Sequence, residues 1–128
     1  MILASLPARL LTLVLGTALA LSAGEAFAIK QFFDEFKEVY VKEGSPLAEA
    51  VGEAKCNVCH VGKSKKNRNA YGEALAKLLD KKEDKKNVEK IRQALETVAA
   101  ESSDPADPAA PTFGDLIAAG KLPGGAAE

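Results

Sequence analysis

The chain has 128 residues, which is a usual length for a single domain. Its 17 basic and 18 acidic side chains give a formal net charge of −1, which excludes the strongly basic composition typical of nucleic-acid-binding proteins. Two cysteines, one histidine and one methionine (Met1) are the only side chains that carry a sulfur or an imidazole.

The first 28 residues have the pattern of a secretory signal peptide. Arg9 precedes an apolar run from residue 10 to residue 21, which is shorter than the roughly 20 residues that a membrane-spanning helix needs. Ala26-Phe27-Ala28 then fits the small-x-small rule for signal peptidase. We expect cleavage after Ala28 and export to the periplasm or an equivalent compartment. The alternative is an uncleaved N-terminal anchor, which would be the only link to a membrane.

Helical spacing of apolar residues begins soon after this segment. Five apolar side chains share one stripe and predict a first helix that ends near Gly44: Phe32, Phe33, Phe36, Val39 and Tyr40. Ser45 then fits a helix N-cap, with Pro46 at the first helical position. We expect this second helix to continue into the segment that holds both cysteines.

Three more helices are predicted in the second half, and no segment has the pattern of a strand. Asn69 and Asn87 are N-cap candidates for two amphipathic helices, which carry Tyr71, Leu75, Leu78 and Leu79, and Val88, Ile91, Leu95 and Val98. Residues 101–111 contain three prolines and predict a loop. Thr112 and Asp115 form a capping-box pattern for a short last helix that Gly120 closes. The prediction is an all-α domain over residues 29–123, with a tail at 124–128.

One motif in the chain carries chemistry. Cys56-Asn57-Val58-Cys59-His60 is the C-x-x-C-H pattern of covalent haem c attachment. Each thiol adds across one vinyl group of the porphyrin, and the two-residue gap matches the spacing of those vinyls on a helical turn. The adjacent histidine is then placed under the iron as its proximal ligand. We therefore predict one covalent haem per chain, bound by Cys56, Cys59 and His60.

Three other interpretations of the motif are weaker. A disulfide between Cys56 and Cys59 would not need a histidine beside it, and so short a loop constrains the unfolded chain little. A thioredoxin-like redox motif needs a strand–helix context, which the helical pattern does not offer. A structural zinc site normally needs four ligands, and the chain has only three cysteine and histidine side chains.

From residue 46 to residue 60 the chain resembles the N-terminal helix and haem motif of small single-haem cytochromes c of class I. The wider pattern is similar to small exported cytochromes c of planctomycete-type bacteria, through the segments NAYG at 69–72, PTFG at 111–114 and AGKLP at 119–123. This resemblance implies a small helical domain wrapped around one haem, with an extra N-terminal helix, and electron transport between redox proteins rather than enzymatic catalysis.

The chain departs from that family at the second iron ligand. Class I carriers usually supply a methionine after the haem motif, but Met1 lies in the predicted signal peptide and no second histidine exists. The sixth position is therefore open, filled by water, or filled by another donor. Lys121 is the candidate that sequence favours, because a neutral amine can bind ferric haem. Tyr71 and the amine of Ile29 are further candidates, although the spacing of Tyr71 also fits a core residue.

The basic loop after the motif is a candidate docking site. Its cations lie next to the predicted haem edge and would attract acidic redox partners: Lys63, Lys65, Lys66 and Arg68. A solvated loop without a partner is the alternative. For the protein as a whole, electron transfer is the first hypothesis. The second is a five-coordinate haem protein that binds a small gas or has weak peroxidase activity, and the third is an interaction module without haem.

Overall fold

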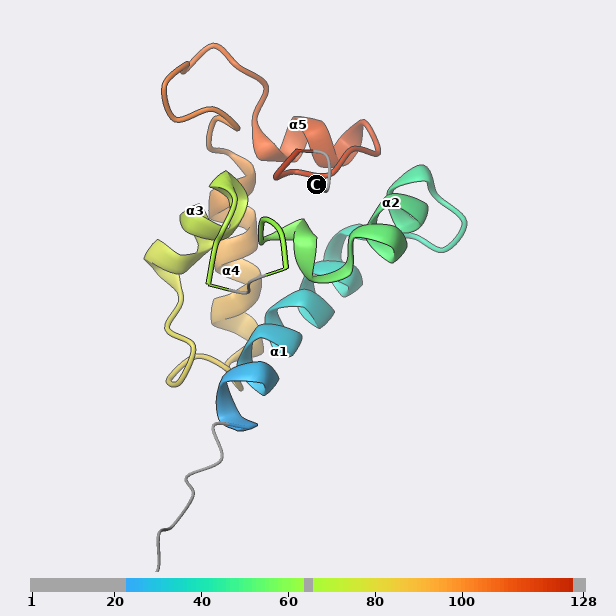
Figure 1. Ribbon diagram of the computed structural model, residues 1–128. Helices are drawn as coiled ribbons and strands as arrows, with labels where there is room; N and C mark the ends of the chain where they lie inside the picture. Colours follow the sequence, from blue (N-terminus) through green and yellow to red (C-terminus); the bar gives the residue numbers. More distant parts are fainter. Residues whose placement is uncertain (1–22, 64–65, 126–128) are drawn as a thin grey trace, which may run out of the picture.

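The computed structural model describes residues 23–63 and 66–125, with side chains described from Lys30 onward. The described chain folds into five α-helices and one 3-10 helix (Figure 1): α1 (Ala23–Tyr40), α2 (Pro46–Ala54), η1 (Lys55–Val58), α3 (Ala70–Leu78), α4 (Val88–Ala99) and α5 (Phe113–Ala118). Within these residues, β-structure is limited to two isolated bridges, one between His60 and Arg68 and one between Ser102 and Thr112. The predicted all-α fold class is confirmed.

Four helices begin where the sequence predicts. The side-chain oxygens of Ser45, Asn69, Asn87 and Thr112 each accept a hydrogen bond from the amide three residues on, at 2.9–3.2 Å. These bonds satisfy amides that have no partner inside the helix. Asp115 also accepts from the Thr112 amide at 3.0 Å, which completes the predicted capping box.

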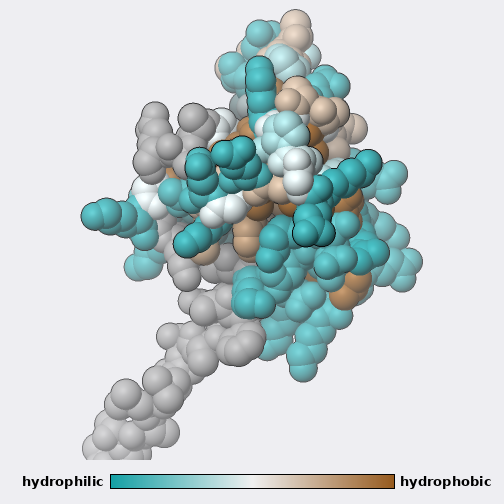
Figure 2. Space-filling view, turned by 90° about the vertical axis from the view of Figure 1, so that its right-hand side faces the viewer, coloured by the Kyte–Doolittle hydropathy of each residue, from teal (hydrophilic) through white to brown (hydrophobic). Residues whose placement is uncertain are grey.

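Helix α4 lies at the centre of the domain, and α1, α3 and α5 pack against it (Figure 1). All five α-helices contribute apolar side chains to one core, whose most deeply buried large members are Tyr71, Phe36, Phe113, Ile91, Leu95, Val58 and Val98. Much of the surface in Figure 2 is hydrophilic, with small hydrophobic areas between polar side chains. The core therefore ties α1, the cysteine segment and α3 to one central helix.

Two helix boundaries differ from the predictions. The first helix ends at Tyr40 rather than near Gly44, because the chain turns at residues 41–45, where the Ser45 amide donates to the Lys42 carbonyl and Gly44 has φ +75°. The second helix does not run unbroken into the cysteines. It ends at Ala54, and Lys55 has φ +51°, which redirects the chain into η1.

The N-terminal helix begins before the predicted cleavage point. Helix α1 starts at Ala23, so the boundary after Ala28 falls inside it, while residues 1–22 of the predicted signal peptide lie outside the described chain. None of the described helices is long and apolar enough to cross a membrane.

Candidate functional site

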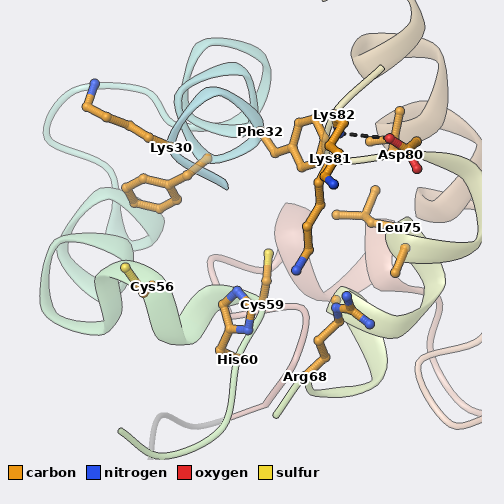
Figure 3. A pocket seen from close by; sticks show the side chains of 14 residues that line it. Lys30, Phe32, Cys56, Cys59, His60, Arg68, Leu75, Asp80, Lys81 and Lys82 are labelled. Atoms are coloured by element: carbon orange, nitrogen blue, oxygen red, sulfur yellow. Dashed lines mark hydrogen bonds between the residues drawn. The ribbon is translucent and has the colours of Figure 1, made fainter. Parts of the chain in front are cut away.

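The cysteine motif forms a tight turn. The amides of Cys59 and His60 both donate to the carbonyl of Cys56, at 3.3 and 3.2 Å. In a 3-10 turn, side chains three residues apart eclipse one another, so the two cysteines project to the same side. Figure 3 shows both thiols and the His60 ring on one wall of a cavity.

That cavity is large enough for a cofactor. Its volume is about 750 Å³, within the roughly 300–1,000 Å³ of small-molecule and cofactor pockets. It is lined by the three motif side chains, by apolar groups from α1 and α3, and by several cations: Lys30, Phe32, Phe33, Cys56, Cys59, His60, Arg68, Gly72, Leu75, Ala76, Leu79, Asp80, Lys81 and Lys82. The walls are mainly apolar, with thiol, imidazole and charged groups among them.

Asn69 fixes the turn to α3. Its side-chain amide nitrogen donates to the carbonyls of Val58 at 3.0 Å and Asn57 at 3.4 Å, while its oxygen caps α3 by accepting from the Gly72 amide at 2.9 Å. The Asn69 backbone amide also donates to the Cys59 carbonyl at 3.0 Å. One side chain thus sets the position of the motif relative to the helix that forms another wall of the cavity.

Gly72 permits this close approach. A Cβ atom at position 72 would lie 2.1 Å from the Cys59 carbonyl oxygen, so any side chain there would push α3 away from the motif. The C-terminal segment closes over the same place, because a Cβ at Gly124 would lie 2.0 Å from the Asn69 amide nitrogen. Packing therefore continues to Gly124, into the segment predicted as a tail.

Both cysteines are free thiols, with Cys56 exposed and Cys59 half-buried. Burial, with a smaller contribution from Cys56, raises the pKa of the Cys59 thiol to about 12. A thioredoxin-like redox motif needs a strand–helix context, and the described residues around the cysteines form α2 and η1 without a strand, so they do not fit that role. Nor do three His, Cys, Asp or Glu side chains of the described chain converge as ligands of a metal ion.

The structure separates the candidates for the second iron ligand. Lys121 is exposed and does not line the cavity. Tyr71 is fully buried outside the cavity lining, with its ring centroid 5.8 Å from that of Phe36 and 5.2 Å from that of Phe113. It is therefore a core residue, as its helical spacing also suggested. The amine of Ile29 would exist only after cleavage at Ala28, and in the described chain Ile29 lies inside α1.

The predicted docking loop divides into two parts. Lys63 and Lys66 are exposed beside the motif, whereas Arg68 is half-buried, lines the cavity and lies 3.8 Å from Glu73. Lys65 lies outside the described residues. Sequence reasoning missed the cavity-lining roles of Phe32, Phe33 and Leu79, and of the lysines at 81 and 82.

Compared with protein-family models, curated proteins and solved structures, the chain gives no match.

Proposed function

We propose that this protein is an exported c-type cytochrome that carries one covalent haem and transfers electrons between redox partners. The observation that supports it most is the common wall formed by Cys56, Cys59 and His60 in a cavity of about 750 Å³ with apolar sides. The residues present fit the group: two thiols and an imidazole on one turn, and cations that can pair with its carboxylates.

Each residue of the motif has one task. The thiols of Cys56 and Cys59 each add across a vinyl group, so that a carbon–sulfur bond forms and the thiol hydrogen passes to the other vinyl carbon. This addition consumes no oxidant. The His60 imidazole would hold the iron from the same wall.

Haem, when bound, supplies a centre that gains or loses one electron. Phe32 and Phe33 on α1, with Leu75 and Leu79 at α3, line the cavity and would surround the group with apolar side chains that limit its contact with water. Lys63 and Lys66, exposed beside the motif, suit encounter with acidic redox partners, and this attraction would weaken as salt rises.

The test is expression of the full chain in a bacterial host with haem c maturation. We expect one haem per chain that remains attached after denaturation, and a reversible one-electron change in the visible spectrum. Cys56→Ala and Cys59→Ala should each leave one thioether bond at most, and the double variant should carry no covalent haem. A wild-type protein that is exported and folded with two free thiols, or with a disulfide and no haem, would overturn the proposal.

A further inference from the structure

The cavity contains few groups able to bind iron opposite His60. This inference rests on the proposed function, because it concerns the second axial position of the same haem. Cys56 and Cys59 are used in attachment, and Arg68 cannot lose its proton and so has no lone pair to offer. The Asp80 carboxylate also lines the cavity, but it accepts hydrogen bonds from two backbone amides of its own turn. Of the other described lining residues, three amines remain: Lys30, Lys81 and Lys82.

Two of these amines are poorly placed. The Lys30 side chain is 70% exposed, and its Nζ lies 2.8 Å from an Asp34 carboxylate oxygen on the same helix. Lys82 lines the cavity but is exposed to solvent. Lys81 is half-buried, and Figure 3 shows its side chain extending into the cavity toward the wall that carries Cys59 and His60. None of the described residues forms an ion pair with its ammonium group.

The backbone that carries Lys81 is held in place by its neighbours. The Asp80 carboxylate accepts from the amides of Lys82 and Glu83 at 2.7 and 2.9 Å. The Asp80 amide donates to the buried Asp84 carboxylate at 2.7 Å, and Lys90 on α4 holds that carboxylate at 2.8 Å. Leu79, immediately before the turn, is buried and lines the cavity. The turn is therefore a fixed platform anchored to the central helix.

From this placement we infer that Lys81 supplies the second axial ligand of the haem iron through its Nζ atom. Coordination uses the neutral amine, so one proton leaves Nζ for solvent when the bond to iron forms. The assignment moves the distal ligand from the C-terminal segment, where Lys121 lies, to the turn between α3 and α4.

Ligation by Lys81 would favour electron transfer over gas binding. With a protein ligand on each side, the iron keeps both ligands and has no open position for a small molecule. Loss of that ligand would open the site, which makes the proposal visible by spectroscopy without any assay of electron transfer. A charged lysine that only pairs with a haem carboxylate makes a different prediction, because arginine can replace it.

The experiment compares visible spectra of the haem-loaded full chain, oxidised, reduced, and reduced with carbon monoxide. We expect low-spin bands, unmoved by carbon monoxide, for wild type. Lys81→Ala and Lys81→Arg should both lose the low-spin spectrum and bind carbon monoxide, although arginine retains the charge. Lys121→Ala is the control that should resemble wild type, because Lys121 is exposed and lies outside the cavity lining. Lys81→Met should restore a low-spin spectrum and raise the reduction potential, because a thioether replaces the amine.

The outcomes separate this inference from the proposed function. Absence of covalent haem from wild type overturns both. Attached haem with a high-spin, carbon monoxide-binding spectrum in wild type overturns the Lys81 assignment alone and favours a gas-binding haem protein. A low-spin spectrum that survives in Lys81→Arg or Lys81→Ala also overturns it. If the Lys81→Ala protein does not accumulate, the Lys81→Met protein tests the assignment. A reduction potential equal to that of wild type would show that the side chain at position 81 does not reach the iron.

Discussion

The side-chain amide of Asn69 donates to the carbonyl of Val58 at 3.0 Å, which joins the start of α3 to the cysteine turn. Asn69→Ala should therefore remove both a helix cap and the partner of a motif carbonyl. We expect a loss of about 2–4 kcal/mol in the free energy of unfolding, since the cap contributes about 1 kcal/mol and an unpaired buried acceptor costs about 1–3. Urea denaturation of the full chain measures this.

Asn87 is the matched control for that variant. Its side chain caps α4 by accepting from the Lys90 amide at 3.1 Å, but it is exposed and makes no hydrogen bond to a second segment of the described chain. Asn87→Ala should cost only about 1 kcal/mol. Substitution by aspartate sharpens the comparison, because aspartate keeps the oxygen that caps the helix but loses the N–H donor. Asn87→Asp should therefore leave the free energy of unfolding nearly unchanged, whereas Asn69→Asp should lower it. Equal losses of stability in Asn69→Ala and Asn87→Ala would mean that the hydrogen bond from Asn69 to Val58 does not stabilise the fold.

Gly72→Ala tests the close approach of α3 to the motif. The added methyl group would overlap the Cys59 carbonyl oxygen, so the variant should lose about 1–3 kcal/mol of stability. Gly52→Ala on α2 is the control, because nothing lies within 4 Å of its new methyl group. That substitution should stabilise the chain by about 0.5–1 kcal/mol, as expected for a glycine inside a helix. A Gly72→Ala protein as stable as wild type would contradict the contact.

Local signals predicted most of the fold. The caps at Ser45, Asn69, Asn87 and Thr112 each depend on a side chain bonding an amide three residues away, so the information lies within one turn of sequence. The break after Ala54 was not predictable in the same way. It depends on Lys55 adopting a positive φ, a conformation that no local preference of lysine favours.

The cavity depended on tertiary contacts that the sequence does not display. The C-x-x-C-H spacing indicated that Cys56, Cys59 and His60 lie together, and these residues form one wall of the cavity. The opposite wall includes Lys81, which lies 21 positions after His60 in a run of mixed charges typical of a solvent-exposed segment. The second role of Asn69 was hidden for the same reason: its cap bond is local, whereas its bonds to Asn57 and Val58 span 12 and 11 residues. The Asn-x-x-Gly spacing of Asn69 and Gly72 was the one signal that could have suggested a close contact.

The Asp84 carboxylate should make stability depend on acid pH. Hydrogen bonds from Lys90, and then from the Asp80 amide, lower the pKa of Asp84 below its ordinary value. A carboxyl with a lowered pKa in the folded state contributes stability above its unfolded pKa of about 4, and that stability is lost as pH falls through the folded value. The free energy of unfolding of wild type should therefore decrease below about pH 4 more steeply than that of Asp84→Asn.

The control for Asp84 is Glu53→Gln. Glu53 is exposed on α2 and has no ion pair within the described chain. Below about pH 4, the free energy of unfolding of Glu53→Gln should decrease with the same slope as that of wild type, when both are measured by urea denaturation across pH. If the stability of Asp84→Asn falls with pH as steeply as that of wild type, the Asp84 carboxylate does not stabilise the turn.

Two tyrosines with different hydroxyl environments allow a paired test of the core. The Tyr40 hydroxyl donates to the Leu95 carbonyl at 3.1 Å, while the buried Tyr71 hydroxyl has no hydrogen-bond partner among the described residues. Tyr40→Phe should lose about 0.5–1.5 kcal/mol, because one hydrogen bond is removed. Tyr71→Phe should be at least as stable as wild type and gain up to about 3 kcal/mol, because an unsatisfied buried hydroxyl is removed. Thermal and urea denaturation of the full chain measure the difference between the two variants. A loss in Tyr71→Phe that exceeds the loss in Tyr40→Phe would mean that the Tyr71 hydroxyl has a hydrogen-bond partner in the folded protein.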